Sequence, residues 1–416
     1  MIGELKITSE GRIRLDLDGM LHRERHEPFH TDSEAEYLAL RPRRIFGVLR
    51  ESGRRVLLLD LWNGPSRHSS YTFSVESFGA AQCLIGDQRF DGTMKEPKFS
   101  RIEADLKGFE EWLWSNALKV KRGKTVFTAK YRKPTQVAYR LQSGRLWFLH
   151  YLDGSHQTGR HPDLTWSERT YIRYAPSKPF GIEGAIEWHR WLQDLMILLT
   201  DSDYCLDLPE VKWGKHTCTL YFQRSTSKAE RPRRHECVVN FPKLKADFGT
   251  VFDTWIAARE KYGSAFYLYL GTRKGVQQYI ENQFFMLVSG IESFHRIKHS
   301  LPRMHLKDRI VQMITDLSLG LADDRVNKFA RDCVKFRNSI AHGGHRSGTG
   351  SYSDYITSVQ HIAGALAPLY HALLLLEIGL DPQMVRDWVI TVPPAFRRRW
   401  ALAQAGLTEP IKMGGD

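Results

Sequence analysis

The chain has 416 residues, enough for two or three domains, and its 42% hydrophobic and 26% charged content is typical of a globular protein. This composition excludes a disordered chain. Sixty Lys and Arg residues against 47 Asp and Glu residues leave a formal charge of +13. The excess favours a polyanionic partner but does not distinguish nucleic acid from a membrane surface.

The cysteines and the apolar segments bear on the cellular compartment. The five cysteines are scattered without metal-ligand spacing, so we expect no disulfide framework, no metal and no cofactor. The segment Met1–Ile7 lacks the basic head and apolar run of a signal peptide. The longest apolar stretch, 361–380, contains His371 and Glu377. We expect it to be a buried helix of a cytosolic protein, because a bilayer span needs roughly 20 mostly apolar residues.

The first two-thirds of the chain is predicted to be rich in strands. Hydrophobic residues alternate with polar ones, largely around Gly-containing turns, in segments 5–17, 48–62, 137–150 and 218–222. Short alternating segments of this kind predict an antiparallel sheet or sandwich. No G-x-G-x-x-G or Walker-type loop stands at a strand-to-helix junction, so the pattern does not favour a nucleotide-binding βαβ fold.

Helical periodicity appears twice within this region and then continues to the end of the chain. The two early helices are predicted over 183–199 and 248–270. After about Gly275 the sequence predicts four helices joined by short loops, over 276–299, 306–319, 326–341 and 355–380. We therefore predict an α+β fold, in which a strand-rich antiparallel N-terminal region precedes an all-α four-helix bundle.

These patterns divide the chain into three predicted parts. Residues 1–272 form the N-terminal region, which we expect to sense or regulate because it carries no recognisable catalytic cluster. Residues 273–385 form the helical bundle, and residues 386–416 form a basic C-terminal tail.

The third bundle helix, 326–341, is predicted to be amphipathic. At 100° per residue, one stripe is apolar and consists of Phe329, Cys333, Phe336 and Ile340. The opposite stripe is polar and consists of Arg331, Lys335, Asn338 and His342. A solvated basic face is the more common meaning of such a stripe.

Two further residues favour a functional meaning. Arg337 lies off the polar stripe, so we expect it to be partly buried and to need a partner or a task. Glu292 is the expected partner, which would give Arg337 a structural role. His342 ends the helix, where the backbone favours a cationic imidazole, and Asn338 one turn earlier is expected to orient the ring. The alternative is a His342 that only caps the helix.

Together these side chains suit cleavage of RNA without a metal ion. Arg337 would neutralise the charge that develops on a phosphoryl oxygen, and His342 would exchange a proton with the attacking or leaving oxygen. RNA supplies its own 2′-hydroxyl nucleophile. Arg331, Lys335 and Arg346 add positive charge that would attract phosphate, so we predict RNA as a partner.

The segment 337–342, R-N-S-I-A-H, resembles the R-x-x-x-x-H motif of HEPN domains. The helix that holds Glu292 and Phe294 resembles the first helix of that fold. The order of a strand-rich region followed by such a bundle is similar to the ApeA-like anti-phage proteins. Supporting similarity lies in the segments 44–47, 56–63, 99–102, 112–113 and 248–260.

This resemblance implies a metal-independent endoribonuclease that cuts by 2′-hydroxyl attack and acts as a defence toxin, stopping growth upon infection. It implies Arg337 and His342 as the catalytic pair, with Asn338 as a polar companion, and two bundles paired in a homodimer. The N-terminal region would hold the nuclease inactive until a phage component or a nucleotide triggers it. The alternative is a non-catalytic HEPN module that binds RNA or protein.

Overall fold

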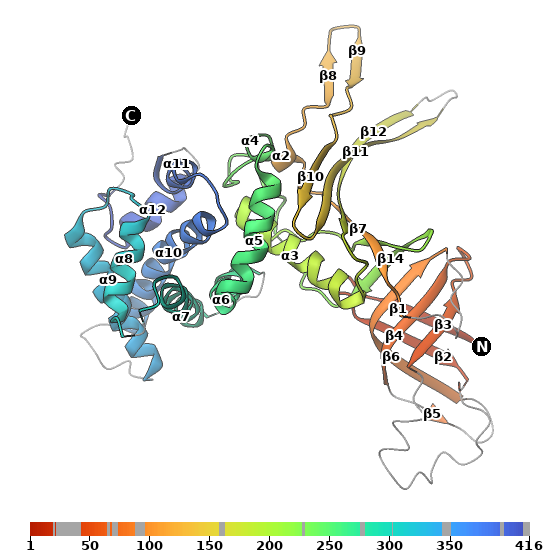
Figure 1. Cartoon of the computed structure of the whole chain (residues 1–416), viewed down its shortest axis with the longest axis horizontal. Helices are drawn as coiled ribbons and strands as arrows, with labels where there is room; N and C mark the ends of the chain where they lie inside the picture. The colour runs from red at the N-terminus through yellow and green to blue at the C-terminus, as the bar shows by residue number, and fades with distance from the viewer. Residues whose placement is uncertain are drawn as a thin grey trace. The chain divides into compact units, whose positions relative to one another are not determined.

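The computed structural model describes residues 1–19, 21, 43–64, 67–68, 74–87, 96–157, 163–226, 229–274, 279–301, 303–342, 351–391 and 395–410 (Figure 1). The chain forms two compact units, each assembled from separate segments. The sheet unit consists of Met1–Lys107, Ala117–Arg190 and Cys205–Thr226. The helical unit consists of Gly108–Asn116, Trp191–Tyr204 and Ser227–Asp416. The helical unit therefore includes segments far upstream of the boundary expected at residue 273.

The sheet unit contains a 12-stranded sheet in which the paired strands are antiparallel. The main path runs β1-β2-β6-β14-β13-β7-β12-β11-β10, and β3, β4 and β5 extend it beside β6. The strands are β1 (Ile2–Ile7), β2 (Ile13–Asp18), β3 (Arg44–Val48), β4 (Arg55–Asn63), β5 (Arg67–His68), β6 (Ser74–Gly86), β7 (Phe99–Asp105), β10 (Val137–Leu141), β11 (Gly144–Gln157), β12 (Asp163–Pro176), β13 (Glu210–Trp213) and β14 (His216–Phe222). The antiparallel, strand-rich N-terminal region is thus confirmed.

The centre of this sheet is buried on both faces. Ile13, Val56, Leu58 and Cys83 are among the buried residues of one cluster, and Leu57 and Leu59 on the opposite face of β4 are buried as well. Outside the sheet, Trp188 is only 3% exposed, and its ring stacks on Tyr174 with centroids 5.4 Å apart. Trp188 therefore packs in the core of this unit.

A second, two-stranded sheet belongs to the same unit. It is the hairpin of β8 (Leu118–Arg122) and β9 (Phe127–Tyr131), which extends away from the neighbouring strands (Figure 1). This hairpin was not predicted from the sequence, although β8 alternates Leu118 and Val120 with lysines, a pattern that favours a strand.

The helical unit contains most of the described helices. They are α2 (Glu110–Leu113), the part of α3 (Ile182–Thr200) from Trp191 onward, α4 (Phe241–Leu244), α5 (Phe248–Tyr262), α6 (Ser264–Arg273), α7 (Ile280–His299), α8 (Leu306–Asp316), α9 (Asp323–Ala341), α10 (Tyr352–Glu377), α11 (Pro382–Arg386), the π-helix η1 (Asp387–Thr391) and α12 (Phe396–Gln404). The single helix expected over 248–270 is two helices, because Gly263 adopts a positive φ of 44° between them.

Helix α10 lies at the centre of this unit and packs against α7, α9 and α12. It is the one helix in the described part of the chain that is long and apolar enough to cross a membrane, and 67% of its most apolar stretch is buried. That burial is typical of a core helix. The C-terminal helical region of the predicted α+β fold is therefore confirmed.

The end of the chain differs from the prediction of a basic tail. Residues 382–404 include α11, η1 and α12, and Trp388 and Leu402 are buried. Apolar residues stand on both sides of the arginine run, and α12 packs against α10 rather than extending into solvent.

Close approach of α7 and α10 depends on Gly290. A Cβ at this position would lie 2.7 Å from the hydroxyl of Tyr370, which is itself held by donating to the Ala265 carbonyl at 2.6 Å. We predict that Gly290→Ala lowers the free energy of unfolding by about 1–3 kcal/mol through overpacking. Gly364→Ala on α10, whose Cβ would meet only ordinary contacts, should be neutral or stabilising by up to ~1 kcal/mol. Urea denaturation measures the free energy of unfolding of both variants. Equal changes in the two would contradict the role of Gly290 in the close approach of the helices.

Candidate functional site

The polar stripe predicted on α9 is exposed in the structure. Asp323 and Asp324 stand in the first turn of this helix, where negative charge is favourable. The exposed residues of the stripe are Arg331, Lys335, Asn338 and His342. On the opposite side, Phe329 and Cys333 are buried. The C-terminal half of α9 thus presents nitrogen-rich side chains to solvent.

Arg337 is half-buried, as expected, but its partner differs from the prediction. Its Nη1 donates to Oδ1 of Asn338 at 3.2 Å. Glu292 instead accepts from Arg296 at 3.1 Å, one turn along α7, so the expected Glu292–Arg337 pair is not what the structure shows. A neighbour on the same helix is within easy reach of the Glu292 carboxylate.

Asn338 therefore orients the guanidinium of Arg337 rather than the imidazole of His342. Its link to His342 is through the backbone, since the Asn338 carbonyl accepts from the His342 amide at 3.1 Å. His342 is the C-cap residue of α9 and is exposed. Gly343, Gly344 and Arg346 lie outside the described residues.

Aromatic side chains fix this end of α9 in the helical unit. Phe336 contacts Phe284 of α7 edge to face at 6.5 Å and Tyr355 of α10 at 5.7 Å. Tyr355 also stacks with Tyr352 at 6.2 Å, and Tyr352 is 56% exposed. An exposed tyrosine beside a cationic helix end could contact a nucleobase. The sequence analysis missed Tyr352, because it belongs to another helix.

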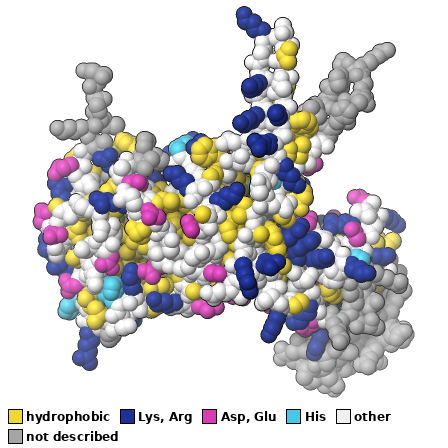
Figure 2. Space-filling view, turned by 45° about the horizontal axis from the view of Figure 1, so that its top comes forward, with side chains coloured by type: hydrophobic (Ala, Val, Ile, Leu, Met, Phe, Trp, Pro, Cys, Tyr) yellow, Lys and Arg dark blue, Asp and Glu magenta, His cyan; other side chains and the backbone are white. Residues whose placement is uncertain are grey.

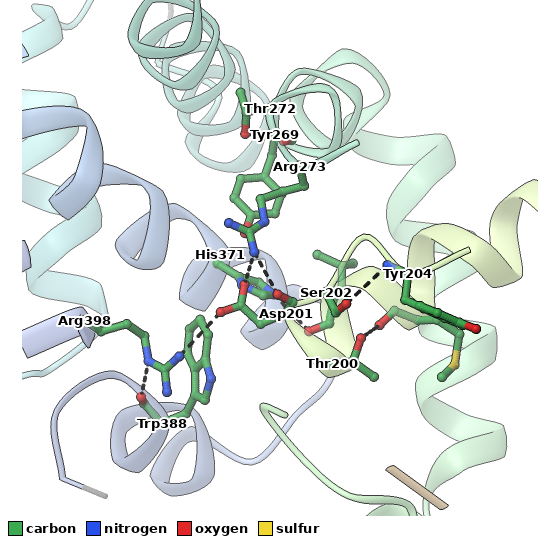
Figure 3. Close-up of polar contacts among 12 residues, drawn as sticks. Thr200, Asp201, Ser202, Tyr204, Tyr269, Thr272, Arg273, His371, Trp388 and Arg398 are labelled. Carbon is green, nitrogen blue, oxygen red and sulfur yellow. Dashed lines mark hydrogen bonds and ion pairs between the residues drawn. The ribbon is translucent and has the colours of Figure 1, made fainter. Parts of the chain in front are cut away.

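A second polar cluster, which we call the Asp201 cluster, lies inside the helical unit (Figure 3). Asp201 directly follows α3 and adopts a positive φ of 54°. Arg273 of α6 donates to its backbone carbonyl at 2.8 Å and to Oδ1 at 2.7 Å. Arg398 of α12 donates to Oδ2 at 3.4 Å, and Nδ1 of His371 on α10 lies 3.5 Å from Oδ1.

Asp201 supplies the negative charge that the cationic groups of this cluster share. Burial opposes ionisation of this carboxyl, but Arg273, His371 and Arg398 together lower its pKa to about 2. Asp201 in turn raises the pKa of Arg273. Burial lowers the pKa of His371, although its contact with Asp201 acts in the opposite direction. We therefore describe the cluster as one carboxylate, two guanidiniums and a neutral imidazole.

Further hydrogen bonds connect this cluster to the helices around it. His371 Nε2 is 2.9 Å from the Leu198 carbonyl of α3, and Arg398 Nε donates to the Trp388 carbonyl at 2.7 Å. The cluster thus joins α3, α6, α10, η1 and α12. Arg397–Arg399 lie in the segment that was predicted from the sequence to be a basic C-terminal tail. Arg397 and Arg399 are exposed, but the side chain of Arg398 is only 12% exposed.

Within the described residues, no group of three or more His, Cys, Asp or Glu side chains is placed to hold a metal ion. His22, His26 and His30, which repeat every four residues, lie outside the described part of the chain.

Residues 2–255 match the family model of ApeA N-terminal domain 1, which covers more than half of the 416-residue chain. The chain belongs to this ApeA family. Membership associates the protein with anti-phage defence. The match ends before α7, so it does not extend to the helices that carry Arg337 and His342. No curated protein and no solved structure matches the chain.

The carboxylate of Asp201 should be a major source of stability in this ApeA-family protein. We predict that Asp201→Asn lowers the free energy of unfolding by about 3 kcal/mol, because two guanidiniums lose their shared counter-charge in a largely buried setting. Asp247→Asn, at the exposed N-cap of α5, should change it little, since Asn is an equally good N-cap residue. Urea denaturation at neutral pH measures the free energy of unfolding of both variants. Similar losses of stability in the two would contradict the stabilising role of the Asp201 carboxylate.

The neutral imidazole of His371 gives stability a pH dependence. Because burial lowers its pKa below the ordinary 6.5, the unfolded chain binds more protons as the pH falls. Stability from this group is therefore present above pH 6.5 and lost on acidification. We predict that His371→Gln, which keeps a hydrogen-bond donor, flattens the decline in urea midpoint between about pH 7 and pH 5. If the urea midpoint of the variant declines with pH as steeply as that of wild type, groups other than His371 control the pH dependence of stability.

Proposed function

We propose that this ApeA-family protein is a metal-independent endoribonuclease effector of anti-phage defence, with Arg337 and His342 as its catalytic pair. One observation carries the proposal most directly: an exposed imidazole ends α9, and a guanidinium held by Asn338 precedes it by five positions. Both stand on the helix that also presents Arg331 and Lys335 to solvent.

Each side chain has a distinct role in the proposed reaction. The 2′-oxygen of a ribose attacks the adjacent phosphorus, loses its proton, and displaces the 5′-oxygen of the next nucleotide, which takes up a proton. The products are a 2′,3′-cyclic phosphate and a 5′-hydroxyl. His342 transfers one of these protons. Arg337 donates hydrogen bonds to the phosphoryl oxygen as its negative charge grows, and Asn338 positions the guanidinium.

The surroundings of the pair suit an RNA strand. Arg331 and Lys335 lie on the same exposed stripe of α9 and would contact flanking phosphates. The exposed ring of Tyr352 offers a surface on which an unpaired base can stack. Phosphate contact by these residues fits the chain's charge of +13.

Assembly and regulation complete the proposal. Two copies would pair in the cytosol so that both Arg–His sets face one cleft, as the resemblance to HEPN domains implies. The N-terminal region would restrain cleavage until a phage component or a nucleotide binds. Release of the nuclease would then stop growth of the infected cell.

We predict that purified protein cleaves total RNA in excess chelator and that Arg337→Ala and His342→Ala each reduce the rate by at least about 100-fold. Arg303→Ala and His305→Ala, which remove an exposed Arg and His elsewhere in the helical unit, should keep the wild-type rate. Growth arrest on expression in cells provides a second readout for a protein that is inactive at rest.

The outcomes separate the two classes of function. Cleavage that survives both substitutions would overturn the assignment of the pair. A protein that binds RNA without cleaving it, and whose expression leaves growth unaffected, would instead be a non-catalytic binding module.

A further inference from the structure

The hairpin of β8 and β9 is the most strongly basic segment of the sheet unit. Residues 117–133 contain seven Lys and Arg residues and no Asp or Glu. All seven basic side chains are exposed: Lys119, Lys121, Arg122, Lys124, Lys130, Arg132 and Lys133. Figure 2 shows the resulting concentration of Lys and Arg along this projecting hairpin.

The strand register sorts these side chains onto two faces. Lys119 pairs with Lys130, and Lys121 pairs with Thr128, so three lysines point to one side, which we call the cationic face. The other side is apolar except at its outer end, where Arg122 pairs with Phe127. Its apolar residues are Leu118, Val120, Phe127, Ala129 and Tyr131.

The cationic face is electrostatically unfavourable in the free protein. Lys119 and Lys130 stand directly opposite each other, an arrangement that destabilises a strand pair, and a lone two-stranded hairpin is only marginally stable. No ion pair of Lys119, Lys121 or Lys130 is recorded among the described residues. A regular array of negative charges outside the chain would relieve this repulsion.

We propose that the β8–β9 hairpin is a binding arm for double-stranded DNA, with its cationic face directed at the phosphates. A two-stranded ribbon fits the B-form major groove, which is about 12 Å wide, and other β-ribbon proteins bind duplexes in this way. Lys119 and Lys121 follow each other along β8 at the two-residue spacing of roughly 7 Å. Arg122 and Lys124 extend the positive charge to the tip.

Three other anionic partners fit this surface less well. Single-stranded RNA is held by aromatic stacking and positive charge on one surface, whereas Phe127 and Tyr131 lie on the face opposite the lysines. The major groove of duplex RNA is too narrow for side chains to read. A membrane would require the apolar and cationic groups to meet one surface together, and here they point apart.

The test measures binding of the full-length protein to a fluorescent 20-base-pair DNA duplex by anisotropy at several salt concentrations. Lys119→Gln/Lys121→Gln/Lys130→Gln should weaken binding by at least about tenfold at 0.1 M salt. It should also reduce the slope of log K against log salt by about 2–3, since each phosphate contact contributes about 0.9. Lys130→Gln alone should give a smaller loss in the same direction.

The matched control removes the same charge elsewhere. Lys178→Gln/Lys215→Gln/Lys243→Gln, at three exposed positions outside the hairpin, should stay within about threefold of wild type. Equal weakening by both triple variants would overturn the proposal, because binding would then follow net charge. A larger effect of the hairpin triple variant on binding of single-stranded RNA of equal length, or of vesicles with anionic lipid, than on binding of duplex DNA would also overturn it.

The proposed ribonuclease can be tested separately from this surface. Arg337→Ala and His342→Ala should leave duplex DNA affinity unchanged, because α9 belongs to the helical unit and the hairpin to the sheet unit. Thermal denaturation checks the folding of each lysine variant, and the hairpin triple should be at least as stable as wild type once the cross-strand repulsion is removed.

Discussion

One ionised carboxylate, that of Asp201, holds the helical unit in its arrangement. It accepts hydrogen bonds from guanidiniums on α6 and α12 and contacts the imidazole of α10. His371 belongs to α10, and α10 also packs against α7 and α9. Helix α10 therefore links this charge to α9, the helix that carries Arg337. A buried charge left unpaired costs several kcal/mol, a large part of a typical domain's 5–15 kcal/mol stability.

Much of the fold could be predicted because periodicity is local. The helices of 276–380 and the alternating strands follow from which residues share a face, and the structure contains both. The composition of the helical unit could not be predicted in this way. Segments 108–116 and 191–204 join it through contacts distant in sequence. The early end of the helix at Gly263 was missed because its neighbours on both sides favour a helix.

The candidate site was predictable in outline but not in its contacts. Spacing alone put Arg331, Lys335, Asn338 and His342 on one exposed stripe. Which partner Asn338 takes depends on side-chain rotamers, and its amide oxygen accepts from the adjacent Arg337. The burial of Arg398 could not be predicted, because arginines stand on both sides of it in the sequence. Only the structure shows that its side chain is 12% exposed.

The wide separation of the Asp201 cluster along the chain has a consequence for biosynthesis. Its carboxylate, on Asp201, is synthesised 197 residues before the last of its guanidiniums, Arg398 of α12. Nascent chains that already contain the R-N-S-I-A-H segment still lack α12. Premature termination between these two segments would therefore yield fragments that contain the motif but lack Arg398, one of the two guanidiniums that pair with Asp201.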